Sequence, residues 1–168
     1  MARKKPDAPP PTSQARARSK NRSSKQPGVQ RPMLSVRILL VSSVREDHET
    51  LHSMLAEDYL IADADTCQEA VGFLCRDRVP LIFCERDLPD GNWRDILSHL
   101  AELTDAPALV VTSKFADEYL WSEVLNLGGF DVLAKPFREL EVKHVVAGAL
   151  RQQAPAQRVL AAGTAGLD

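Results

Sequence analysis

The sequence contains few cysteines and no long apolar run, and both absences exclude classes of protein. Its three cysteines, Cys67, Cys75 and Cys84, are odd in number and widely spaced. This pattern argues against a disulfide framework or a zinc site and favours reduced thiols. No stretch approaches the roughly 18 apolar residues of a membrane span, and the N-terminus lacks the apolar segment of a secretory signal. We therefore expect a cytoplasmic protein without a membrane span.

Acidic and aromatic residues are nearly absent from positions 1–33. This segment holds nine of the 21 Lys and Arg residues but one of the 23 acidic residues, so its formal charge is about +8 and that of residues 34–168 about −10. Because it is rich in Pro and Ser and has few large apolar side chains, we expect a disordered tail. Its charge suits nucleic acid, anionic lipid or an acidic partner, but without aromatic residues base recognition has little support.

From residue 34 onward, short apolar runs alternate with helical patterns. The strand-like runs lie at 36–41, 59–62, 81–84, 107–112 and 131–134, and the helical patterns at 43–55, 66–76, 93–103, 116–127 and 139–152. This alternation predicts an α/β fold with a five-stranded, doubly wound parallel sheet and five helices, which is the flavodoxin-like class with strand order 2-1-3-4-5. We expect one domain over 34–152, followed by a flexible tail at 153–168.

The run from Pro80 to Gly91 is central to the functional prediction. Its apolar part is typical of a strand buried on both faces, and Glu85 is the first side chain beyond that part. In open α/β sheets, functional sites lie outside the carboxyl ends of the strands. We therefore expect Glu85 to lie in any site that this chain has.

Polar residues also follow the other central strands. They are Ser42 and Ser43 after the first strand, Thr112 and Ser113 at the end of the fourth, and Lys135 with Pro136 after the fifth. With Glu85, this set resembles the strand ends of receiver domains in bacterial two-component response regulators. The resemblance covers roughly residues 36–152. It extends to the spacing of Glu85, Pro89 and Gly91, and to the run Leu125, Gly128, Asp131, Lys135, Pro136 and Phe137.

The resemblance implies a phosphorylation site, from which this sequence departs. In the family, an acid pair after the first strand and a phosphoacceptor aspartate after the third hold Mg²⁺; here Ser42, Ser43 and Glu85 take those places. Hydroxyl groups are poor substitutes for carboxylates toward Mg²⁺, so we expect metal binding to be lost or very weak. The family often has an aromatic switch residue three positions before the lysine. Val132 occupies that position here, so Thr112, the switch-equivalent residue of strand four, has no aromatic counterpart.

Without a metal, Glu85 and Lys135 are expected to form a direct ion pair across adjacent strand ends. Two interpretations stay open: the pair mimics the phosphorylated state, or it only neutralises charge. Ser43, with Glu46 three residues later, is a capping-box pattern, and we expect it to cap the first helix. Asp47 is then expected to interact favourably with the positive end of the helix dipole.

Four other features are weaker candidates. His48 and His52 share a helix face but have no evident third ligand, so an exposed face is preferred to a metal site. Cys84 is expected to point into the core. Trp121 is expected on the outer side of its helix, either as an interface anchor or covered by the tail. Turn chemistry is preferred for the fourth feature, the acids Asp87 and Asp90.

The expected function is that of a stand-alone, degenerate receiver that acts as a protein-interaction module and is not an enzyme. The resemblance implies a signalling partner such as a histidine kinase or another regulator, with a homodimer also possible. Two alternatives are a receiver that accepts a phosphoryl group on Glu85 and a protein that binds nucleic acid through residues 1–33. Loss of the acid pair argues against the first, and steep salt dependence would identify the second.

Overall fold

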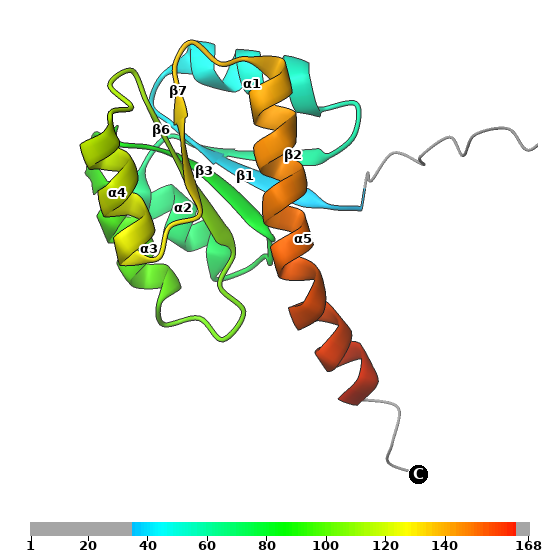
Figure 1. The fold of residues 1–168 in the computed structure, drawn as a ribbon. Helices are drawn as coiled ribbons and strands as arrows, with labels where there is room; N and C mark the ends of the chain where they lie inside the picture. Colours follow the sequence, from blue (N-terminus) through cyan, green and yellow to red (C-terminus); the bar gives the residue numbers. More distant parts are fainter. Residues whose placement is uncertain (1–34, 164–168) are drawn as a thin grey trace, which may run out of the picture. The chain divides into compact units, whose positions relative to one another are not determined.

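A computed structural model describes residues 35–163, with side chains described up to residue 154. Its main sheet has five parallel strands in the order β2-β1-β3-β6-β7. The strands are β1 (Arg37–Val41), β2 (Leu60–Ala64), β3 (Leu81–Glu85), β6 (Ala108–Ser113) and β7 (Asp131–Ala134) (Figure 1). The predicted strand order is confirmed. The basic segment 1–33, and with it the alternative of nucleic-acid binding, lies outside the described residues.

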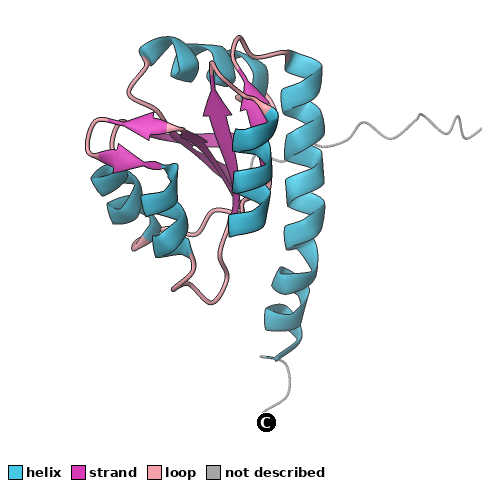
Figure 2. Cartoon of the chain, turned by 60° about the vertical axis from the view of Figure 1, so that its left-hand side comes forward, coloured by secondary structure: helices cyan, strands magenta, loops and turns pink. Residues whose placement is uncertain are grey.

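Helices cover both faces of this sheet, as Figure 2 shows. They are α1 (Arg45–Leu55), α2 (Cys67–Leu74), α3 (Trp93–Leu100), α4 (Glu118–Leu127) and α5 (Glu139–Gly163). Buried residues of α1 and α5 pack together with one face of the strands, and those of α2, α3 and α4 pack with the other. None of the described helices is both long and apolar enough to cross a membrane.

The central strands are buried on both faces, which explains their continuous apolar sequence. In β3, Leu81 and Phe83 belong to the core beneath α1 and α5, whereas Ile82 and Cys84 belong to the opposite core. Cys84 is fully buried, as predicted, and burial raises the pKa of its thiol. Each fully buried large apolar side chain contributes about 1.5–3 kcal/mol, so these strands form the rigid base on which the site residues stand.

Most helix ends follow local sequence signals, but the start of α1 does not. Helix α1 begins at Arg45 after Val44, with no side-chain cap, and Ser43 is exposed. The predicted Ser43 capping box is therefore wrong. The Val44 N–H donates instead to the Ser42 hydroxyl, 3.1 Å away, so the serine nearer the sheet holds this turn. At the end of α4, Gly128 takes a φ of 100°, as expected of a residue that ends a helix in the left-handed region.

Two segments differ from the predicted elements. Helix α5 continues past Gln152 to Gly163, so its predicted end is wrong. The alanines of this extension favour helix, although Pro155 within it does not, and Gln153 donates a hydrogen bond to the Ala106 carbonyl. The loop after β3 forms a small antiparallel hairpin of β4 (Asp87–Leu88) and β5 (Gly91–Asn92).

Asp90 lies at the tip of this hairpin. Its carboxylate accepts hydrogen bonds from the backbone N–H groups of Cys67 and Gln68 at the start of α2, at 2.8 and 2.9 Å. Backbone N–H donation from Gln68 and then Cys67 lowers the pKa of Asp90. The prediction of turn chemistry alone for Asp90 is thus incomplete, because its carboxylate also stabilises the N-terminus of a neighbouring helix.

Candidate functional site

The carboxyl ends of the central strands bring the predicted site residues to one edge of the sheet. In the parallel register, Glu85 of β3 lies opposite Thr112 of β6. The next residue of β6, Ser113, pairs with Ala134, and its carbonyl accepts a hydrogen bond from the Lys135 N–H at 2.9 Å. Lys135 therefore follows directly from the end of β7, and its peptide bond to Pro136 is cis.

Lys135 is the centre of a buried charged cluster. Its ammonium group donates to Glu85 Oε1 at 2.8 Å and also to Asp47 Oδ2. The exposed fractions of the three side chains are 5% for Lys135, 17% for Glu85 and 10% for Asp47. The ion pair predicted between Glu85 and Lys135 is present. Charge-assisted hydrogen bonds between buried partners are stronger than neutral ones, so this geometry holds the lysine firmly.

Asp47 is the site residue that the sequence analysis missed. It lies in the first turn of α1, where acids commonly interact with the helix dipole, and we assigned it only that role. However, Asp47, Leu51 and Leu55 recur every four residues and are the buried residues of this helix. An acid in phase with the apolar row of a helix points toward the core, so the spacing was the signal that could have identified it.

Ser42 completes the cluster. Its hydroxyl oxygen lies 2.7 Å from Asp47 Oδ2 and 2.9 Å from Glu85 Oε2. A hydroxyl has one proton to donate, so the two carboxylates share one donor at Ser42 and one ammonium at Lys135. We call these four residues, Ser42, Asp47, Glu85 and Lys135, the Lys135 cluster. Two carboxylates and one ammonium give it a formal charge of −1.

The other predicted site residues form no hydrogen bond with the Lys135 cluster. Ser43 is exposed, although it is adjacent to the buried Ser42. Thr112 is buried, and its carbonyl accepts the Arg86 N–H at 2.9 Å. Val132, on β7, is half-buried beside Trp121. Of the two serines at the acid-pair positions, one is therefore in the site.

The donor set of this edge does not suit Mg²⁺. Among residues 35–154, no group of three or more His, Cys, Asp or Glu side chains is arranged to hold a metal ion. Both carboxylates of the Lys135 cluster already bind the ammonium, and the remaining donor is a hydroxyl. A hard cation would have to displace the ammonium and lose much of its hydration for few ligands. Weak or absent Mg²⁺ binding stays a prediction.

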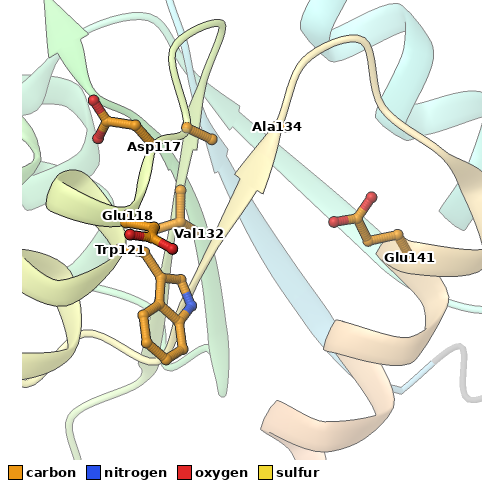
Figure 3. Close-up of a pocket in the computed structure, with 7 residues that line it drawn as sticks. Asp117, Glu118, Trp121, Val132, Ala134 and Glu141 are labelled. Atoms are coloured by element: carbon orange, nitrogen blue, oxygen red, sulfur yellow. The ribbon is translucent and has the colours of Figure 1, made fainter.

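A second candidate region lies between α4 and α5, across β7 (Figure 3). Trp121 is 49% exposed, and its indole N–H donates to Asp131 Oδ1 at 3.1 Å. It borders an open cavity of about 270 Å³ whose lining residues are Ala116, Asp117, Glu118, Trp121, Val132, Ala134 and Glu141. We call this surface the Trp121 face. The prediction that Trp121 lies on the outer side of its helix is confirmed; its role at an interface stays a prediction.

The two histidines of α1 are not simply exposed. His48 is 13% exposed, and Asp63 of β2 lies between it and His52. The preference for an exposed helix face is therefore wrong for His48. The strand β2 supplied the missing partner, which no local sequence pattern of α1 indicates.

The fold and the strand-end lysine define a class of signalling domain, the flavodoxin-like receivers. A family profile described as response regulator receiver domain matches residues 38–147, and the chain belongs to this family. No curated protein matches the sequence with significance.

Solved structures agree with this assignment. A two-component response regulator from Clostridium difficile is 27% identical, with a TM-score of 0.63, covering 69% of this chain and 96% of that one. The non-phosphorylated HemR receiver domain from Leptospira biflexa is 25% identical, with a TM-score of 0.61 and coverage of 68% and 93%. A CheY-like receiver domain protein from Methanospirillum hungatei, at 20% identity, TM-score 0.65 and coverage of 72% and 98%, is similar in fold.

Proposed function

We propose that this receiver domain is a pseudo-receiver, which acts as a protein-interaction module in two-component phosphorelay signalling without being phosphorylated. It needs no Mg²⁺ and catalyses no phosphoryl transfer. The observation that carries the proposal is the position of the Lys135 ammonium between Glu85 and Asp47, with all three side chains nearly buried.

Both oxygens of the carboxylate at the phosphoacceptor position already have hydrogen-bond partners, which disfavours nucleophilic attack. One oxygen of Glu85 accepts from Lys135 and the other lies within hydrogen-bond distance of the Ser42 hydroxyl. Attack on a phosphoryl donor requires an oxygen lone pair in line with the leaving group and, in this chemistry, a metal that neutralises developing charge. Glu85 is also one methylene longer than aspartate. Each of these features argues for a site that holds charge rather than transfers a phosphoryl group.

The same contacts favour a single, fixed state. Removing one partner from a buried ion pair costs about 3–5 kcal/mol, because the remaining charge stays buried without compensation. Glu85 brings its carboxylate to 2.8 Å from the Lys135 ammonium, so the strand-three residue contacts the lysine directly. We propose that this contact is permanent and replaces the transient one that a phosphoryl group would make.

The Trp121 face is the proposed contact surface. The half-exposed Trp121 shares a cavity with the apolar side chains of Val132 and Ala134 and is the proposed interface anchor. The acids Asp117 and Glu141 border the same cavity, so the surface suits a partner that brings positive charge to the rim. The proposed partner is a signalling protein such as a histidine kinase or another regulator; a second copy of the chain is the other candidate.

An NMR titration tests the phosphorylation-independent part of this proposal. Amide spectra of the chain are recorded with Mg²⁺ and then with beryllofluoride, which mimics a phosphoryl group on a carboxylate. We expect no saturable shifts at Ser42, Ser43, Glu85 or Thr112. The matched control is the variant Ser42→Asp, Ser43→Asp, Glu85→Asp, which restores the acids of the family and should respond. Saturable shifts in the natural sequence that spread from Glu85 to α4 would overturn the proposal.

A further inference from the structure

His48 makes two polar contacts that connect α1 to the sheet. Its Nδ1 lies 2.7 Å from Asp63 Oδ1 on β2, and its Nε2 lies 2.7 Å from the Ser42 carbonyl oxygen at the end of β1. The side chain is 13% exposed, so water has limited access to either nitrogen.

The chemistry of these partners determines how many protons the ring carries. A backbone carbonyl and an ionised carboxylate can only accept hydrogen bonds, so both ring nitrogens must donate. Only the imidazolium form has two N–H groups. The neutral ring keeps one of them and must give up either the contact to Asp63 or the contact to Ser42.

Titratable groups from two segments, the end of β2 and α1 itself, lie around this ring. Asp63 faces it from β2, and Asp65, just after β2, has Oδ1 3.5 Å from Nε2. On α1 itself, His52 Nε2 lies 2.9 Å from Asp63 Oδ2, so the two histidines share one carboxylate. Burial lowers the pKa of His48, but the Ser42 carbonyl, then Asp63 and Asp65, raise it more, and the pKa lies above its ordinary 6.5.

Ser42 links this ring to the Lys135 cluster. Its carbonyl contacts His48, while its hydroxyl contacts Asp47 and Glu85. Asp47 is also the residue before His48 in the first turn of α1. The ring is therefore connected to the cluster by two routes, through Ser42 and through the backbone that joins Asp47 to His48.

We propose that His48 is a proton-sensitive link that couples pH to the Lys135 cluster. In the protonated state it holds the end of β1 and the first turn of α1 against β2, with Ser42 and Asp47 in place. Loss of the proton releases one contact, and Ser42 and the start of α1 rearrange. This inference adds regulation by pH to the site of the proposed function. Only its relevance to signalling rests on that proposed function.

The sign of the effect follows from the raised pKa. A group whose pKa is higher in the folded state contributes stability that is fully present below its unfolded pKa. That contribution is lost as the pH rises through the folded pKa. The link is therefore complete below about pH 6.5 and weakens above it.

The test is an NMR pH titration of the full chain, at fixed ionic strength and with a chelator that removes metal ions. It follows the imidazole signals of His48 and the amide signals of Ser42, Val44 and Asp47. We expect the amides to titrate with the midpoint of His48, above pH 6.5. The histidines at 99 and 144 lie on other helices and serve as internal references.

Three variants separate a link from an incidental contact. In His48→Gln, the shared midpoint should vanish from the Ser42 and Val44 amides. In Asp63→Asn, it should persist but fall by roughly one pH unit, because a neighbouring negative charge is removed. In His52→Gln, the matched control on the same helix face, the amides should keep following His48.

Two results would overturn the proposal. Amides of Ser42 and Val44 that do not follow His48 would show that the ring contact has no effect on the cluster. A shared midpoint that persists in His48→Gln would assign the titration to another group. If His48→Gln does not fold, Asp63→Asn decides. A midpoint of the Ser42 and Val44 amides that falls together with that of His48 supports the proposal, and an unchanged amide midpoint overturns it. The titration contains no metal ion or phosphodonor. Its outcome therefore does not depend on whether the domain accepts a phosphoryl group, and failure of this proposal can be told apart from failure of the proposed function.

Discussion

The Lys135 cluster and the Trp121 face lie on the same domain but differ in how they use charge. In the cluster, each charged group contacts an opposite charge, and all three are at most 17% exposed. On the Trp121 face, an aromatic ring is half exposed, and acids line an open cavity. In this chain, then, the edge that carries phosphorylation chemistry in the family is filled by side chains, whereas the surface beside it is left open to another molecule.

One of the two largest expected effects comes from removing the shared cation. Lys135→Met leaves Glu85 and Asp47 buried without their counter-charge, so we expect the free energy of unfolding to fall by about 3–5 kcal/mol. Urea denaturation measures this. Lys143→Met is the matched control, because Lys143 pairs with Glu139 on the exposed side of α5 and should change stability by less than about 0.5 kcal/mol. Similar values for both variants would contradict the assignment of the cluster.

The two tryptophans provide a direct comparison of core and surface. Trp93 is fully buried and Trp121 is half exposed. We expect Trp93→Ala to cost about 3–5 kcal/mol of stability. Trp121→Ala should cost less than about 1 kcal/mol. Iodide should quench the fluorescence of Trp121, measured in Trp93→Phe, but not that of Trp93, measured in Trp121→Phe. Equal quenching would mean that Trp121 is covered.

Glu85→Gln should have an intermediate effect. The amide keeps the shape and one acceptor, while Asp47 still neutralises Lys135, so we expect a loss of about 1–3 kcal/mol. If the pair sets the signalling state, amide shifts should also reach α4 and β7. Shifts confined to the site would mean that the Glu85–Lys135 pair only neutralises charge and does not set the signalling state.

The smallest effect is the pH dependence of stability. Because the pKa of His48 is raised in the folded state, the free energy of unfolding should fall as the pH rises from about 6.5 through that pKa. Urea denaturation at a series of pH values measures the slope, and His48→Gln should reduce it. An unchanged slope in this variant would assign the pH dependence to other groups.

Much of the fold could be predicted because its signals are local. The short apolar runs predicted the positions of the strands. The polar residues that follow them predicted the edge of the sheet at which Glu85 and Lys135 meet. The start of α1 could not be predicted, because two adjacent serines offered the same capping chemistry and only their depth differs. Ser42 is buried and binds the Val44 N–H, whereas Ser43 is exposed.

The site was predicted less completely than the fold. Asp47 has two ordinary roles in a first helical turn, at the dipole or in the core, and its phase with Leu51 was the only distinguishing signal. The contact of His48 with Asp63 joins two elements through a tertiary approach, which periodicity does not report.

The shared proton of Ser42 has an evolutionary consequence. Restoring the first acid alone, by Ser42→Asp, removes that proton and places a third carboxylate beside a single ammonium, so the intermediate is destabilised by like-charge repulsion. Restoring Glu85→Asp alone shortens the side chain and draws its carboxylate away from Lys135, without supplying a metal site. Under the proposed function, neither of these two single changes supplies a working phosphorylation site, so the path to one requires several substitutions together.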